Sequence, residues 1–470
     1  MSRNYHAARA SLPVSAGGRG IARGAGSPRP HGRPATSALT VELGVLIFTA
    51  LAVLTALTIS PSLLTHWKIQ YVTAGGGFYE KLHPATYFVV LALGMALLRN
   101  ANPVHELVRI FATSKAILLY VLCWLFLLAQ TIQLQRPFTG IVDTFLLPLL
   151  IVLAIWQTPA WGRKSLVILL HLLIVLNIAI GYYEYFAGHR IIPLTLGNVI
   201  VLGEWRSAAL LGHPLTASGL VAGYVLALIL RPQVCPQPML RLPLIFLSLG
   251  SLMVFGGRTA LVTTLVLIGL SVAFGLFRLM RGGRIPVLAL IAGIGVLFAG
   301  AAAIFALLDL GVFDKMLLRF SSDKGSAMAR VAMLDLLSHL DWNEILFAPT
   351  VSRANALQSA LGLDYGIENF WIACIVQFGL VQTVLMTLAL GAFFAMLLRR
   401  SSGAAYALLV LIAIIAASSV SFSSKNIQLA QFVILITLLL PRGRPSTVAV
   451  GVSPARSRLR VRPVQAGSLP

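Results

Sequence analysis

The sequence predicts an all-α protein that crosses a membrane about twelve times. Three observations lead to this fold class. The chain of 470 residues is 58% hydrophobic and only 11% charged, a balance that differs from that of soluble globular proteins. Its apolar runs are close to the roughly 20 residues that a helix needs to cross a bilayer. Nearly every basic loop between these runs falls on the same side of the membrane, as the positive-inside rule requires.

The predicted spans lie between two basic tails, residues 1–37 and 442–470, with nine spans in 38–308 and three in 369–441. The runs cover about 39–60, 84–98, 113–132, 138–157, 165–185, 210–230, 240–256, 259–277, 285–308, 369–398, 404–420 and 426–440. Gly379 interrupts the tenth run, which therefore predicts a short outer helix followed by a true span.

The two tails are rich in Arg, Pro, Ser and Gly, and this composition predicts disorder. The net charge of +22 would suit a nucleic-acid partner, but its placement in the tails and short loops indicates topogenic charge and contact with anionic lipid headgroups. We therefore expect membrane lipids and no nucleic acid as partners. No apolar segment follows a short charged start, so no cleavable signal peptide is expected. Three scattered cysteines are too few for a disulfide framework.

The basic loops also predict the orientation of the chain. If the N-terminal tail is cytoplasmic, the even-numbered loops and the C-terminal tail are cytoplasmic as well. These loops carry Arg99, Arg109, Arg163, Lys164, Arg231, Arg241, Arg278, Arg281, Arg284, Arg399 and Arg400. Both termini are therefore expected inside.

A long hydrated loop, residues 309–368, is expected on the outer side. It holds eight of the fourteen acidic residues of the chain, mixed with basic ones. Apolar residues recur at helical spacing in Met328–Leu337, which predicts an amphipathic helix over the mouth of the bundle. A loop this long between short ones favours a function rather than a simple connection.

Two arginines occupy turns that this topology places outside, namely Arg206 and Arg258. An arginine there needs an anionic partner, and phosphate matches its planar fork. His213 stands before Pro214 at the start of a span, where free N–H groups favour an anion. A capped helix entry at His213 and contact of Arg258 with lipid phosphate are the structural alternatives.

Two further elements face the same side. Arg330 lies on the predicted amphipathic helix, and Glu368-Asn369 opens the tenth span just before Phe370-Trp371. Their structural alternatives are a solvated charge and a helix cap beside interfacial aromatic residues. The acids within spans do not line up as a proton relay, and the acids of the loop lack the spacing of a metal site. We predict no metal and no cofactor.

The order of these elements resembles the superfamily of O-antigen ligases and Wzy-type polysaccharide polymerases. That superfamily has an Arg…Gly-His-Pro element, then Ser/Gly-x-Arg-Thr/Ser-Ala opening the span two further on. A loop Arg follows, and then a His/Asp/Glu-Asn element begins the next span. The resemblance covers about residues 200–395. Glu368 stands where ligases often have His, which favours a polymerase, and Phe347-Ala348-Pro349 replaces a Gly-x-Gly often found later in the loop.

The resemblance implies a bacterial inner-membrane glycosyltransferase with a periplasmic active site. Its donor is a glycan on undecaprenyl pyrophosphate, and its acceptor is a growing polysaccharide. Arg206 and Arg258 would stabilise the leaving pyrophosphate, with His213 as a second donor or a base. Glu368 would orient the acceptor or take its proton, Asn369 would bind substrate, and Arg330 would clamp the glycan. A chain-length-control protein is a partner that the resemblance allows.

Three alternatives remain open at the level of the sequence. A ligase would move the finished glycan onto a lipid A core or another acceptor. A lipid-glycan flippase or transporter should carry charges along a central path through both leaflets, whereas the unusual charges here concentrate at one face. A non-catalytic assembly protein is the third alternative.

Overall fold

The computed structural model describes residues 35–73, 75–196, 199–200, 206–281, 309, 311, 314, 326–363, 366–419, 422 and 425–442. Helices form nearly all of this part of the chain, which also has one antiparallel pair of two-residue strands, β1 (Thr195–Leu196) and β2 (Val199–Ile200). The predicted ninth span, about 285–308, lies outside the described residues, as do most of both tails. The first helix begins at Ala35, so it includes the last three residues of the predicted N-terminal tail.

The long helices of the bundle are α1 (Ala35–Thr58), α3 (Pro84–Leu97), α5 (Lys115–Gln133), α7 (Leu147–Gln157), α8 (Ala160–Ala187), α9 (Pro214–Leu230), α10 (Pro238–Phe255), α11 (Arg258–Met280), α18 (Leu380–Arg399), α19 (Ala405–Ser418) and α20 (Gln428–Leu439). The short helices are α2 (Pro61–His66), η1 (Phe78–Lys81), α4 (Pro103–Phe111), α6 (Thr139–Ile141), η2 (Val142–Leu146), η3 (Ala209–Leu211), η4 (Pro232–Val234), α14 (Ser326–Ser338), α15 (Trp342–Phe347), α16 (Val351–Ala360) and α17 (Phe370–Phe378).

Among the described residues, seven helical segments are long and apolar enough to cross a membrane, and four shorter apolar helices accompany them. The seven are Leu39–Thr58, Lys115–Gln133, Thr139–Gln157, Ala160–Ala187, Pro238–Phe255, Arg258–Phe277 and Leu380–Arg399. Large apolar side chains such as Leu172, Phe274 and Leu388 are exposed on these helices, as lipid-facing residues would be. The all-helical membrane class is thus supported, and the count of twelve crossings stays a prediction.

Local sequence explains where several helices begin. The helices α2, α3, α4 and α9 each have a proline in the first turn, where the missing N–H costs nothing. The residues before them, Ser60, His83, Asn102 and His213, each accept a hydrogen bond from a backbone N–H of that turn. These caps fix the positions of the loops that lead into the helices.

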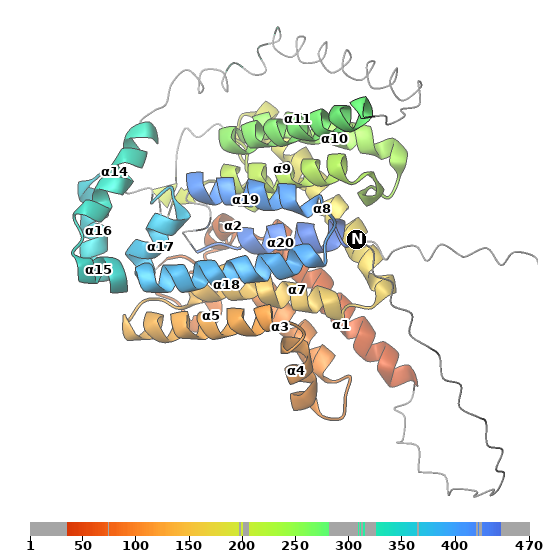
Figure 1. Ribbon diagram of the computed structural model, residues 1–470, viewed down its shortest axis with the longest axis horizontal. Coiled ribbons are helices and arrows are strands. Elements are labelled where there is room, and N and C mark those ends of the chain that lie inside the picture. The colour runs from red at the N-terminus through yellow and green to blue at the C-terminus, as the bar shows by residue number, and fades with distance from the viewer. Residues whose placement is uncertain are drawn as a thin grey trace, which may run out of the picture.

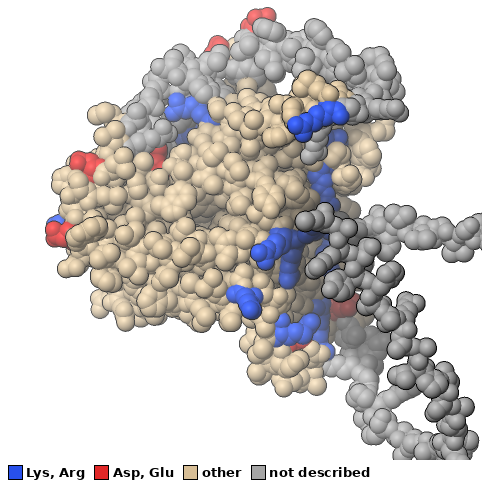
Figure 2. Space-filling view, viewed as in Figure 1, with Lys and Arg blue, Asp and Glu red and all other residues tan. Residues whose placement is uncertain are grey.

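Basic loops gather at one end of the bundle, which we call the basic end. Arg99 donates 2.9 Å to Oε1 of Gln157, and Arg442 donates 3.1 Å to the carbonyl of Arg399. Arg231 and Arg241 bind backbone carbonyls at the ends of α20 and α9. Figure 2 shows Lys and Arg side chains gathered mainly toward the right of the molecule. The loops that the positive-inside rule groups together are therefore neighbours in space.

The helices of the long loop cover the opposite end, which we call the loop end (Figure 1). The expected amphipathic helix is present as α14, and its Met333 and Leu336 form a small apolar core with Ile367, Ile372 and Val376. One face of α14 is thus buried against α17, which attaches the loop to the bundle, whereas Met328, Val331 and Leu334 of the same helix are exposed.

The expected break of the tenth span is present at Gly379, between α17 and α18. Its φ of +82° lies in the region that favours glycine. A Cβ at this position would collide with the carbonyl oxygen of Leu346 and lie 2.8 Å from the backbone nitrogen of Ala348. The break therefore lets the end of α15 dock directly on the backbone between α17 and α18.

Candidate functional site

A buried carboxylate holds the segment that carries Arg206. Glu184, near the end of α8, is 3% exposed and accepts hydrogen bonds from the backbone nitrogens of Ile191, Ala208 and Ala209 at 3.0, 3.0 and 2.9 Å. Arg190 donates 2.7 Å to the carbonyl oxygen of Arg206 itself. Three backbone N–H groups donate to the two oxygens of the Glu184 carboxylate. The backbone around Arg206 is therefore held in place both by Glu184 and by Arg190.

His213 caps α9 through its ring. Its Nδ1 accepts a hydrogen bond of 3.2 Å from the backbone nitrogen of Leu215. In the neutral ring this contact places the proton on Nε2, which makes Nε2 a donor. Gly212 has a φ of +75° and packs against Ser60, where a Cβ would lie 2.6 Å from that of the serine. The structure thus fits His213 as a hydrogen-bond donor better than as a base.

The second element, Gly256-Gly257-Arg258, lies against the first. Gly256 has a φ of +65° and ends α10, and Arg258 is the first residue of α11. A Cβ on Gly257 would collide with the side chain of Ser218, which is in the second turn of α9. The backbone nitrogen of Ser207 also donates to the carbonyl of Val254 at 3.4 Å. Arg206, His213 and Arg258 therefore lie on adjoining turns at the loop end.

The Glu368-Asn369 element is linked to α9 through α19. Asn369 caps α17 by accepting from Trp371 and Ile372, and its Nδ2 donates 3.3 Å to the carbonyl of Ala417. Ile415, half a turn earlier on α19, is so close to Gly219 of α9 that a Cβ there would lie 3.1 Å from its Cδ1. Glu368, like Arg206 and Arg258, is half-buried. Arg330 lies on α14, which packs on α17, and its side chain is outside the described part.

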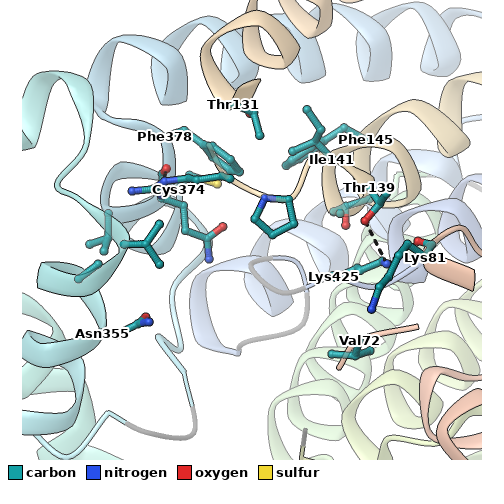
Figure 3. A pocket seen from close by; sticks show the side chains of 18 of the residues that line it. Val72, Lys81, Thr131, Thr139, Ile141, Phe145, Asn355, Cys374, Phe378 and Lys425 are labelled. Carbon is teal, nitrogen blue, oxygen red and sulfur yellow. Dashed lines mark hydrogen bonds between the residues drawn. The ribbon is translucent and has the colours of Figure 1, made fainter. Parts of the chain in front are cut away.

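A cavity at the loop end, lined in part by α17, contains basic residues that the sequence reasoning missed. It has a volume of about 700 Å³ and includes Lys81, Arg136 and Lys425 in its lining (Figure 3). The lining includes none of Arg206, His213, Arg258 or Glu368. All three cations lie in loops that the twelve-span topology places outside. Arg206 and Arg258 were selected as basic residues in outer turns. The same criterion, applied to every outer loop, also selects Lys81, Arg136 and Lys425.

Lys425 is anchored deep in this region. Its Nζ donates 2.8 Å to the carbonyl of Tyr71 and 3.3 Å to Oγ1 of Thr139, and it lies 3.9 Å from the centre of the Tyr71 ring. Burial lowers the pKa of the Lys425 ammonium to about 8, with Asp143 opposing the shift and Lys81 adding to it. Lys425 therefore carries a charge at neutral pH, and that charge is lost as the pH rises above about 8.

Asp143 has a structural role behind the cavity. It lies on the π-helical turn η2, is fully buried, and accepts from Tyr71 Oη at 2.9 Å, Thr86 Oγ1 at 2.7 Å and the His83 nitrogen at 3.1 Å. A π-helical turn widens the helix locally and is often found at functional sites. Asp143 thereby ties the segment after α2, the start of α3 and η2 together beneath Lys425.

Within the residues that the structure describes, no group of three or more His, Cys, Asp or Glu side chains could hold a metal ion. The expectation that the chain needs no metal and no cofactor stays a prediction. Comparisons of the chain with protein-family models, with curated proteins and with solved structures found no match.

Proposed function

We propose that this chain is a bacterial membrane polymerase that joins oligosaccharide units carried on undecaprenyl pyrophosphate. One observation carries the proposal. Arg206, His213 and Arg258 lie on adjoining turns at the loop end, away from the basic end, and Asn369 bonds to α19, which packs on α9 and α11. Cations with directed N–H groups, together with a carboxylate that can take a proton, are the groups that transfer from a pyrophosphate leaving group needs.

The chemistry follows from the leaving group. An acceptor hydroxyl oxygen attacks the anomeric carbon of the donor sugar, and the bond from that carbon to the pyrophosphate oxygen breaks. The guanidinium groups of Arg206 and Arg258 stabilise the charge that grows on the pyrophosphate, and His213 donates from Nε2. Glu368 takes the proton of the attacking hydroxyl. Attack from the face opposite the leaving group inverts the anomeric carbon.

The finer topology belongs to the same proposal. Twelve crossings place both termini in the cytoplasm and the loop end in the periplasm, where lipid-linked units are polymerised. Membrane lipids surround the exposed apolar helices, and a chain-length-control protein is a partner. Arg330 contacts the glycan from α14. Glu368, in place of the histidine that ligases often have, favours the polymerase over the ligase.

Reconstitution tests this function. The purified protein is placed in liposomes with lipid-linked oligosaccharide extracted from the source bacterium after deletion of the gene for this chain. We expect a ladder of polymers on a gel together with release of undecaprenyl pyrophosphate. Glycan transfer only when lipid A core is added would instead identify a ligase. Movement of intact donor across the bilayer without release of the lipid would identify a flippase and overturn the proposal.

Replacing Glu368 with Gln is expected to slow polymer formation by about 100-fold or more, because the amide cannot accept the hydroxyl proton. Donor binding, measured with the extracted lipid-linked oligosaccharide, should change little. Asp335→Asn is the matched control, since it removes one negative charge from an exposed position on α14. Equal losses of donor binding and of rate in Glu368→Gln would show that Glu368 is not the base.

A further inference from the structure

The cavity at the loop end has two unlike walls. Lys81 and Lys425 belong to the outer loops of the bundle, whereas Asn355 and Gln358 project from α16 of the long loop. Figure 3 shows Asn355 across the cavity from Lys81 and Lys425. A volume of about 700 Å³ is typical of pockets that enclose small organic ligands. The long loop therefore supplies one half of a pocket and the bundle supplies the other.

The charge of this cavity is strongly one-sided. The described lining includes Lys81, Arg136 and Lys425 and no Asp or Glu. The hydrogen-bond acceptors of these cations are backbone carbonyls and a hydroxyl: Thr73 for Lys81, Gln377 and Pro349 for Arg136, and Tyr71, Lys81 and Thr139 for Lys425. Such partners satisfy hydrogen bonds but neutralise no charge.

Two carboxylates lie near the cavity without lining it. Asp143 is buried behind Lys425 and shares its charge with Tyr71, Thr86 and His83. Glu80 lies against Gly76. Arg136 has in addition a buried Nε for which the described residues offer no acceptor. The cavity as a whole keeps an excess of positive charge, and this favours an anionic occupant.

The remaining polar groups specify more than an anion. Asn355, Gln358 and Gln377 provide amides, and Thr73, Thr131 and Thr139 provide hydroxyls. The rings of Phe145 and Phe378 and the ring of Pro137 add apolar faces to the same lining. Neutral donors and acceptors interleaved with apolar faces match a sugar ring, which carries hydroxyls on its rim and C–H groups on its faces. A phosphate headgroup would need only the cations.

We propose that this cavity binds an acidic saccharide, a sugar bearing a carboxylate, within the glycan that the enzyme handles. This inference rests on the proposed function for the identity of the glycan as substrate. The carboxylate lies among Lys81, Arg136 and Lys425, and the amides of α16 hold the hydroxyls from the opposite wall. The enzyme thereby selects repeat units that contain an acidic sugar, at a place separate from the pyrophosphate-binding arginines.

The test measures binding by the full chain in detergent, by titration calorimetry at low salt. Tetragalacturonic acid is the acidic probe, its fully methyl-esterified form is the matched neutral probe, and glycerol 3-phosphate represents a headgroup. We expect the acidic probe to bind about tenfold or more tightly than the ester, since each charge-assisted hydrogen bond adds about that factor. Lys81→Gln should weaken the acidic probe alone, and Asn355→Ala should weaken both saccharides.

Lys68→Gln is the control, because Lys68 is an exposed lysine of the same outer region that does not line the cavity. It should leave binding unchanged. Equal binding of acid and ester, or an equal effect of Lys68→Gln and Lys81→Gln, would overturn the inference. Displacement of the acidic probe by glycerol 3-phosphate at similar concentration would show a headgroup site instead. The binding test measures no catalysis. Failure of the polymerase assay therefore does not affect the binding result, and failure of the binding test does not affect the polymerase assay.

Discussion

Replacing Arg258 with Lys is expected to lower the rate of polymer formation by about 100-fold while the protein still inserts and folds. Lysine keeps the charge but presents a point ammonium in place of a planar fork, so it cannot make two parallel hydrogen bonds to a pyrophosphate. Removing one directed donor from a developing anion costs about 10²–10³ in rate. The position of Arg258 at the first residue of α11, on a turn packed against α9, leaves little freedom to compensate.

The matched control lies at the other end of the same helix region. Arg281 follows α11, is exposed, and lies 4.3 Å above the Phe277 ring. Arg281→Lys makes the same chemical change away from the loop end and should leave the rate within about twofold, as surface changes usually do. Both variants are compared in the reconstituted assay and by the chain length of the polymer in a deletion strain. Normal activity of Arg258→Lys would remove the pyrophosphate role from this turn.

Replacing Gly379 with Ala is expected to destabilise the loop end by about 2–5 kcal/mol. Two effects add. The positive φ at this position is costly for alanine, and the new Cβ would strike the backbone of Leu346 and Ala348. The strain is released most easily when α15 leaves the junction of α17 and α18. Detachment of α15 would also displace α16, which carries one wall of the cavity.

Gly391→Ala is the control for this change, on the same helix α18. A Cβ at Gly391 meets nothing within 4 Å, so alanine should be neutral or stabilise the helix by up to about 1 kcal/mol. Thermal unfolding in detergent and the rate of protease cleavage within residues 326–363 report the difference. The two variants could instead unfold at the same temperature, with the loop of Gly379→Ala cleaved no faster than that of Gly391→Ala. In that case α15 is not held by the close backbone contact at Gly379.

Hydropathy and loop charge were enough to predict the helical membrane class, the approximate limits of the long apolar helices that the structure describes, and the break at Gly379. These are properties of continuous segments, summed over about 20 residues, and they do not depend on which helix packs beside which. The amphipathic pattern of Met328–Leu337 predicted α14 for the same reason. The number of crossings, the membrane side of each end and the enzyme activity are predictions of the sequence that await the experiments above.

The roles of single side chains could not be derived in this way. Glu184 and Asp143 are acids within predicted spans that do not line up as a relay in the sequence, whereas in the structure each binds backbone or hydroxyl groups of other segments. The outer loop of Lys425 can be identified from the sequence, but its place in a cavity beside Tyr71, 354 residues away, cannot.

The sequence by itself determined which segments are helices and which residues stand at their ends. Only the tertiary structure decided that Arg206, His213 and Arg258 lie on adjoining turns, that α19 links Asn369 to α9, and that α16 closes a positively charged cavity over Lys81 and Lys425. The physical reason is that a helix end is set by local chain chemistry. A pocket, in contrast, exists only where side chains from distant segments leave space between them.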